Sequence, residues 1–167
     1  MRTPTLLLSR CLALALAGVL LFLSSSIFAD GRSISFDRLV LSEEFFSEGA
    51  CFVDVDGDGD NDVVSGPHWY SGPSFRERHA YASPSAVPIK AYSEFFFTYA
   101  HDFNGDRRPD ILAIGMPGNT AHWFENPGRV DGLWKKHAAI NDVGNESPEL
   151  VDITGDGREF GKLVVAH

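Results

Sequence analysis

The stretch that decides the fold reads Asp54-Val55-Asp56-Gly57-Asp58-Gly59-Asp60-Asn61-Asp62 (residues 54–62). A second copy, Asp102-Phe103-Asn104-Gly105-Asp106-Arg107-Arg108-Pro109-Asp110 (102–110), begins 48 residues later. A third copy spans residues 152–160 and begins 50 residues after the second, with Asp152-Ile153-Thr154-Gly155-Asp156. All three copies place an oxygen-bearing side chain at positions 1, 3 and 5 and a glycine at position 4. The chain is therefore organised around a repeat.

The pattern within each copy predicts a loop that binds a hard cation. Five aspartates within nine residues repel one another unless a positive ion compensates their charge. Ca²⁺ takes about six to eight oxygen ligands, which a tight loop can supply from alternate side chains and a carbonyl. The candidate metal ligands are Asp54, Asp56, Asp58, Asp60 and Asp62 in the first loop, Asp102, Asn104, Asp106, Arg108 and Asp110 in the second, and Asp152, Thr154 and Asp156 in the third. Position 7, held by Asp60 and Arg108, would contribute its backbone carbonyl, so its side chain can vary.

The loops do not match an EF-hand, which requires a glutamate at position 12 and a helix on each side. Position 12 is Ser65, Ala113 or Leu163. Short β-branched runs follow the loops and indicate strands. An acidic turn that is merely solvated would also fit one loop, but three copies between apolar segments favour metal binding.

Each repeat contains up to four expected strands. One precedes each loop (49–53, 96–101 and 149–151), and another follows it (63–65, 111–114 and 163–165). Two repeats then add a His-Trp-aromatic run (68–73 and 122–127) and an aromatic-basic run (75–80 and 134–138). Residues 36–40 look like a degenerate copy of the aromatic-basic run. Four strands in roughly 50 residues are typical of a β-propeller blade. We expect an all-β fold of about two complete blades plus partial ones.

The assembled repeat resembles the FG-GAP/VCBS family of secreted calcium-binding β-propellers, which also form the heads of integrin alpha subunits. The resemblance lies in the loop Asp-x-Asp/Asn-Gly-Asp-Gly-x-x-Asp. The first copy satisfies it throughout, whereas Arg107 replaces the second glycine in the second copy. Thr154 and Phe160 depart from it in the third, where we expect weak or no metal binding. Members usually close a ring of roughly seven blades. The resemblance therefore implies a fragment of such a ring, or blades that associate with other chains through their exposed faces.

Residues 1–29 are predicted to be an export signal, which leaves residues 30–167 as the repeat region. Arg2 and Arg10 give a positive start, residues 12–23 form an apolar core, and Ala29 ends a stretch of small residues. The alternative is a membrane anchor, but the core is shorter than the ~20 residues that a span needs. We expect a secreted, periplasmic or cell-surface protein. Removing both arginines changes the formal charge from −9 to −11, which argues against nucleic acid or an anionic membrane surface as partners.

Two functions remain open from the sequence. The first is a non-catalytic propeller, stiffened by calcium, that presents loops to an extracellular protein or a glycan. The alternative is the propeller portion of a secreted carbohydrate-active enzyme, a lyase or a hydrolase. The sequence contains no GxSxG, HExxH or CxxC pattern and no candidate acid/base pair outside the acidic loops, which favours the first. The paired histidines His68/His122 and His79/His137 occupy equivalent repeat positions, so we expect structural roles for them.

Overall fold

The structure is a computed structural model that describes residues 34–144, 147–151 and 163–164. The chain divides into a unit that ends at Arg38 and a second unit of residues 39–167. All strands lie in the second unit, and no described residue is helical. Among the described residues there is accordingly no helix with the length and apolarity to cross a membrane.

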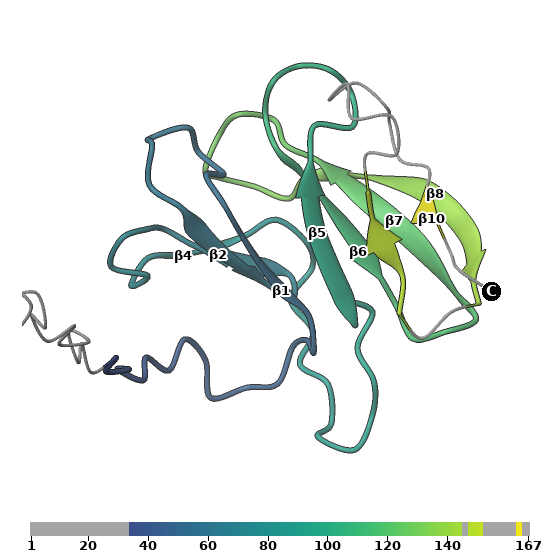
Figure 1. Ribbon diagram of the computed structural model, residues 1–167, viewed down its shortest axis with the longest axis horizontal. Coiled ribbons are helices and arrows are strands. Elements are labelled where there is room, and N and C mark those ends of the chain that lie inside the picture. Colours follow the sequence, from purple (N-terminus) through teal and green to yellow (C-terminus); the bar gives the residue numbers. More distant parts are fainter. Residues whose placement is uncertain (1–33, 145–146, 152–162, 165–167) are drawn as a thin grey trace, which may run out of the picture. The chain divides into compact units, whose positions relative to one another are not determined.

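Two antiparallel four-stranded sheets follow one another along the chain (Figure 1). The first contains β1 (Ala50–Val53), β2 (Asp62–Ser65), β3 (His68–Tyr70) and β4 (Arg78–Ala80), in that order. The second contains β5 (Phe97–His101), β6 (Asp110–Ile114), β7 (Asn119–Glu125) and β8 (Lys135–Val143), also in order. A further antiparallel pair joins β9 (Glu149–Leu150) to β10 (Leu163–Val164). The expected all-β fold, with two complete four-stranded units and part of a third, is confirmed.

The second sheet is packed on both faces. Every residue of β6 is buried. Ile111 and Ala113 belong to one apolar cluster, whereas Leu112 and Ile114 belong to another. Because alternate residues of a strand point to opposite faces, β6 contributes to a core on each side of its sheet. This is the situation of a propeller blade, which lies between two neighbours.

The first cluster joins the two sheets. It contains Val64 and Trp69 from the first sheet and Ile111 and Phe124 from the second. The completely buried Tyr81 lies in the same cluster, and its hydroxyl donates a hydrogen bond of 2.6 Å to the carbonyl of Gly66. The first strands of the two sheets, β1 and β5, also contact each other. The sheets therefore pack as successive blades with their first strands together.

The same aromatic pair stabilises both sheets. Trp69 stacks on His79 with ring centroids 4.2 Å apart, and Trp123 stacks on His137 at 4.1 Å. Each pair is formed by directly opposite residues of the third and fourth strands. The His137 ring also bonds to Glu125, with 2.7 Å between Nε2 and Oε2. These contacts agree with the structural role that the repeat spacing indicates for these histidines.

Two expectations about strands were wrong. Residues 36–40 form no strand, and the Phe36 side chain is 89% exposed, so it lacks the packing that would hold a strand against a sheet. The last strand of the second sheet, expected over residues 134–138, runs on to Val143. It is longer because β7 begins early, and Asn119 at its start pairs with Val143.

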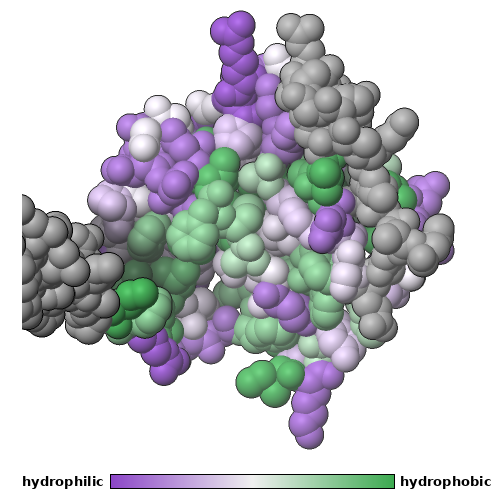
Figure 2. All heavy atoms as spheres, viewed as in Figure 1, coloured by the Kyte–Doolittle hydropathy of each residue, from purple (hydrophilic) through white to green (hydrophobic). Residues whose placement is uncertain are grey.

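Hydrophobic side chains also reach the surface of the molecule. Figure 2 shows them, in green, among hydrophilic side chains on the face that is viewed. Phe52 of β1 is 67% exposed, and Ile89 in the segment between the sheets is 87% exposed. Blades bury such surface against neighbouring repeats. Association through exposed blade faces stays a prediction.

Candidate metal centre

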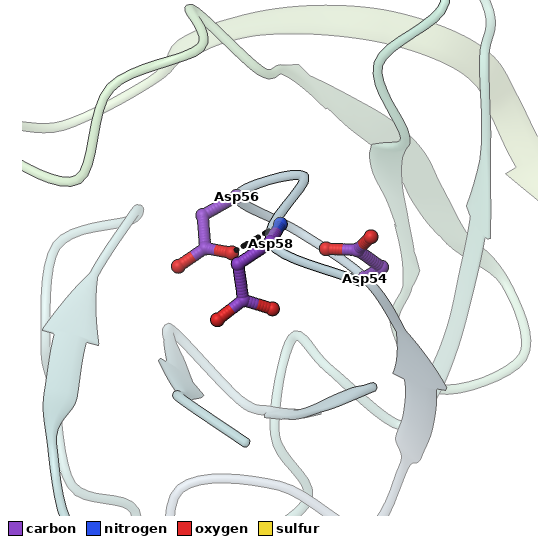
Figure 3. A group of neighbouring side chains, drawn as sticks. All are labelled: Asp54, Asp56 and Asp58. Carbon is purple, nitrogen blue, oxygen red and sulfur yellow. Dashed lines mark hydrogen bonds between the residues drawn. The ribbon is translucent and has the colours of Figure 1, made fainter. Parts of the chain in front are cut away.

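The first acidic loop connects β1 to β2 and gathers three carboxylates. Asp54, Asp56 and Asp58 each offer an oxygen, and these oxygens lie within 4.8 Å of one another. Figure 3 shows the three side chains beside the loop, with a dashed line from the Asp58 N–H to Asp56. Alternate positions of the sequence are thus brought together at one point, as the spacing predicts.

Backbone N–H groups hold Asp54 at the entrance of this loop. Its Oδ1 accepts a hydrogen bond from Gly57 N at 2.8 Å, and its Oδ2 accepts one from Gly59 N at 3.0 Å. These bonds require the chain to curl around the carboxylate, with φ of 80° at Gly57 and 97° at Gly59. Glycine adopts such angles without a Cβ clash. The glycines therefore let the loop close on Asp54.

The other two clustered carboxylates keep oxygens available. Asp56 Oδ1 accepts from Asp58 N at 3.2 Å, and Asp58 Oδ1 accepts from Asp60 N at 2.9 Å. Partial burial raises the pKa of Asp56 above its ordinary value, and the charges of Asp62, Asp58 and Asp54 add to this, although the Asp58 N–H opposes it. A cation at this point would relieve the repulsion between the carboxylates.

Asp60 and Asp62 lie outside this cluster. Asp60 is exposed, and its contribution as a ligand would come from its carbonyl. Asp62 is completely buried, and both of its oxygens accept backbone hydrogen bonds, Oδ2 from Val55 N at 2.7 Å and Oδ1 from Gly72 N at 2.8 Å. Asp62 therefore connects the two ends of the loop and links the loop to the segment after β3.

The second loop, between β5 and β6, repeats the arrangement around its first aspartate. Asp102 Oδ1 accepts from Gly105 N at 2.7 Å, and Oδ2 accepts from Arg107 N at 2.8 Å. Burial would raise the pKa of Asp102, but the N–H groups of Arg107, Gly105 and Asp106 outweigh it, so the pKa lies below its ordinary value. Arg107 has a φ of 70° where the first loop has Gly59, so this loop keeps the same turn with a less favourable residue.

Asp110 repeats the role of Asp62. It is completely buried, and its Oδ2 accepts from Phe103 N at 2.9 Å while its Oδ1 accepts from Asn126 N at 2.8 Å. Burial raises the pKa of Asp110 above its ordinary value, as do the charges of Asp106 and Asp102, while the two N–H groups act in the opposite direction. Position 9 of both loops is therefore a buried acceptor of two backbone N–H groups.

The Arg108 side chain has a role that the sequence analysis did not assign to it. Its guanidinium forms an ion pair with Asp106 Oδ2, and its Nε donates to the carbonyl of Asn126 at 2.9 Å. Asp106 Oδ2 also accepts from Asn104 Nδ2 at 3.0 Å, and Asp106 Oδ1 accepts from Arg108 N at 2.9 Å. The second loop thus carries its own positive charge beside a candidate ligand.

Asn126 connects the two loops and was missed by the sequence analysis. It is buried, and its Nδ2 donates to the carbonyl of Val55 in the first loop at 2.8 Å and to that of Pro109 in the second at 3.1 Å. Its Oδ1 accepts from Gly128 N at 2.8 Å. The only hint in the sequence is that Asn126-Pro127 stands where the first repeat has Gly72-Pro73.

The third loop, with its candidate ligands Asp152, Thr154 and Asp156, lies outside the described residues, as does the predicted export signal at residues 1–29. In the described loops the candidate ligands are carboxylate, amide and carbonyl oxygens. Such a set fits Ca²⁺ or Mg²⁺ rather than a metal that prefers nitrogen or sulfur. Asp54, Asp56 and Asp58 would hold an ion in the first loop, where it would neutralise their mutual repulsion.

Comparison with protein families gives a match to part of the chain. Residues 102–159, which begin at the second loop, match the FG-GAP-like repeat family. No curated protein and no solved structure matches the chain. The matched segment contains β6, β7, β8 and β9, and the first sheet has the same strand order and the same loop contacts. Residues 102–159 thus match an FG-GAP-like repeat, which is a β-propeller-type repeat, and they lie in an all-β structure whose two four-stranded sheets share one strand order.

Proposed function

We propose that the protein is a non-catalytic, calcium-binding propeller repeat protein that acts outside the cytoplasm and presents its loops to a protein or a glycan. The observation that carries the calcium proposal is the convergence of Asp54, Asp56 and Asp58 within 4.8 Å. The loop around them is already shaped by bonds from Gly57 and Gly59 to Asp54, so little rearrangement is needed to receive an ion.

Calcium would act here by stiffening the connection between β1 and β2. Its charge would offset the repulsion between the carboxylates of the metal-free loop. Calcium binding would therefore lower the free energy of the folded state but not that of the unfolded chain. Extracellular calcium modules bind with dissociation constants of about 10⁻⁴–10⁻³ M. At a tenfold excess of calcium over the dissociation constant, one site would stabilise the fold by about 1.4 kcal/mol.

The second loop should bind calcium less tightly than the first. Asp106 is already paired with Arg108, and Asn104 stands where the first loop has a carboxylate. Fewer negative ligands and a competing guanidinium both lower the affinity for a divalent cation. The third loop, with Thr154 at position 3, should bind weakly or not at all.

Calorimetric titration of the full chain with Ca²⁺ tests the proposal. We expect one tighter site in the first loop and a weaker one in the second, together with a rise in the thermal unfolding temperature. Asp56→Asn should remove the tighter site, whereas the control Asp131→Asn, an exposed aspartate outside the loops, should leave it unchanged. No calcium uptake, or uptake that Asp56→Asn does not affect, would contradict the proposal.

Export has its own test, because it depends on residues 1–29. The N-terminus of the protein recovered from outside the cytoplasm should be Asp30. A recovered chain that still contains Leu12 to Leu23 would show that the segment is not removed.

A further inference from the structure

A cleft of about 580 Å³ lies beside the second sheet. One wall is the segment of residues 91–95 that leads into β5, and another is the hairpin between β6 and β7. Ala113 and Phe124 form part of the lining and also belong to the apolar cluster shared by the two sheets. The cleft therefore lies on the face of the second sheet that is turned toward the first repeat.

The first repeat has a much shorter hairpin at the equivalent place. Ser65 pairs with His68, which leaves two residues between them. In the second repeat Ala113 pairs with His122, which leaves eight residues between them. The six additional residues lengthen the hairpin, and its Met116, Asn119 and Thr120 line the cleft. The wall is thus a feature that the second repeat has and the first repeat lacks.

A second difference opens the same space. Phe46 stands eight residues before Asp54, and Glu94 stands eight residues before Asp102. Phe46 is buried and packs edge-on against the buried His68, with ring centroids 4.8 Å apart. The side chain of Glu94 is 87% exposed, and the equivalent histidine, His122, is only partly buried. In the first repeat the contact between Phe46 and His68 therefore fills the space that remains open as a cleft in the second repeat.

The charges of the lining cancel. Lys136 Nζ lies 3.9 Å from Glu94 Oε2, and it is also 5.9 Å from the centre of the Phe124 ring. Burial and the nearby Lys136 lower the pKa of His122, while the charge of Glu94 acts in the opposite direction, and the lowered pKa favours the neutral ring. Because the charges of Glu94 and Lys136 offset each other, the lining offers no net attraction to repay the desolvation of a charged ligand. The cleft therefore fits an uncharged molecule.

The lining offers unused hydrogen-bonding groups beside aromatic surface. Within the described part of the chain, neither the side-chain amide of Asn119 nor the His122 ring has a hydrogen-bond partner, whereas the Asn119 backbone N–H donates to Met116 O. Each can both donate and accept. Tyr92 is 60% exposed, and its ring lies 5.6 Å from that of Phe96. The site thus combines polar groups of both kinds with an aromatic side chain.

We propose that this cleft binds a neutral hexopyranose unit of a glycan. Each sugar hydroxyl donates and accepts hydrogen bonds, which matches Asn119 and His122, and the apolar C–H face of the ring can pack on Tyr92. The volume falls within the range of about 300–1,000 Å³ that is usual for small-ligand sites. This proposal rests on the glycan-binding role proposed above and places it at a site separate from the calcium loops, so a failure of sugar binding leaves the calcium proposal intact.

Titration of the ¹⁵N-labelled full chain with methyl pyranosides tests the proposal. The neutral probes are methyl β-D-glucopyranoside, methyl β-D-galactopyranoside and methyl α-D-mannopyranoside, and the charged counterparts are glucuronic acid and glucosamine. At least one neutral probe should shift the backbone amide signals of Glu94, Asn119 and His122. The charged counterparts should bind at least about tenfold more weakly, since the lining has no net charge to offset the desolvation of theirs.

Two variants with matched controls locate the site. Asn119→Ala should weaken binding about tenfold through loss of its hydrogen bonds. Glu94→Phe, which introduces the aromatic residue of the first repeat, should abolish binding. Asn141→Ala and Glu77→Phe, at exposed positions outside the cleft, should bind like the unaltered chain. Dispersed spectra and unchanged calcium uptake would show that each variant is folded. The proposal is overturned if no neutral probe shifts the cleft signals, if a charged counterpart binds best, or if folded Asn119→Ala and Glu94→Phe chains bind normally.

Discussion

Replacing Asp62 with asparagine should destabilise the protein whether or not calcium is present. The Asp62 carboxylate is completely buried and accepts hydrogen bonds from Val55 N at 2.7 Å and from Gly72 N at 2.8 Å. Asparagine offers one oxygen, so one of the two N–H groups would face the amide nitrogen and lose its acceptor. A hydrogen bond to a charged group contributes about 1.5–3 kcal/mol, and a buried unpaired N–H costs about 1–3 kcal/mol. We therefore expect a loss of about 3 kcal/mol in the free energy of unfolding.

Urea unfolding followed by tryptophan fluorescence, in a chelator and again in calcium, measures this loss. The matched control is Asp60→Asn, because the Asp60 side chain is exposed two residues away in the same loop. We expect the control to stay within about 0.5 kcal/mol of the unaltered chain. If Asp62→Asn unfolds like the unaltered chain in the chelator and differs only in calcium, Asp62 acts as a metal ligand and the reasoning from its two N–H bonds is wrong.

Two further predictions follow from buried groups. Asn126→Ala removes the hydrogen bonds to the carbonyls of Val55 and Pro109 and should lower the free energy of unfolding by about 2–4 kcal/mol. Urea unfolding measures this loss, with Asn141→Ala as the control. If the two variants lose equally little stability, Asn126 does not link the loops. Burial and the nearby Arg78 lower the pKa of His68, so the unfolded chain binds more protons just below pH 6.5, and stability should fall as the pH drops through this window. An NMR titration of the His68 ring checks the sign, since a pKa at or above 6.5 would contradict it.

Most of the fold could be predicted because its pattern is local and repeated. The apolar runs on either side of each acidic loop became the paired strands β1–β2 and β5–β6. The prediction failed at residues 36–40, where the aromatic-basic pattern is present but no strand forms. Residue pattern shows which segments are able to form strands, whereas pairing also needs a neighbouring strand and a surface on which to pack.

Less of the candidate site could be predicted. The spacing places Asp54, Asp56 and Asp58 together, and the structure agrees. The spacing does not distinguish a carboxylate that faces an ion from one that accepts two backbone N–H groups, because both functions require an aspartate at that position. In the described loops Asp62 and Asp110 each accept two backbone N–H groups, and their role as metal ligands stays a prediction. The sequence could have revealed the cleft only through the six additional residues between Ala113 and His122 and through Glu94 in the place of Phe46, and the effect of both depends on how these segments fold.

In the two described loops the buried carboxylates accept backbone hydrogen bonds, whereas the more exposed carboxylates keep oxygens that could bind a cation. Asp62 and Asp110 receive backbone bonds that need no metal, so each loop can close as the strands pair. The clustered carboxylates of the first loop are left with oxygens for a cation, so calcium would reinforce a loop that is already closed rather than create it. Asn126 binds the carbonyl of Val55 in the first loop while its own N–H bonds to Asp110 in the second. An ion that ordered the first loop would therefore also restrict the second, because both loops contact the buried Asn126.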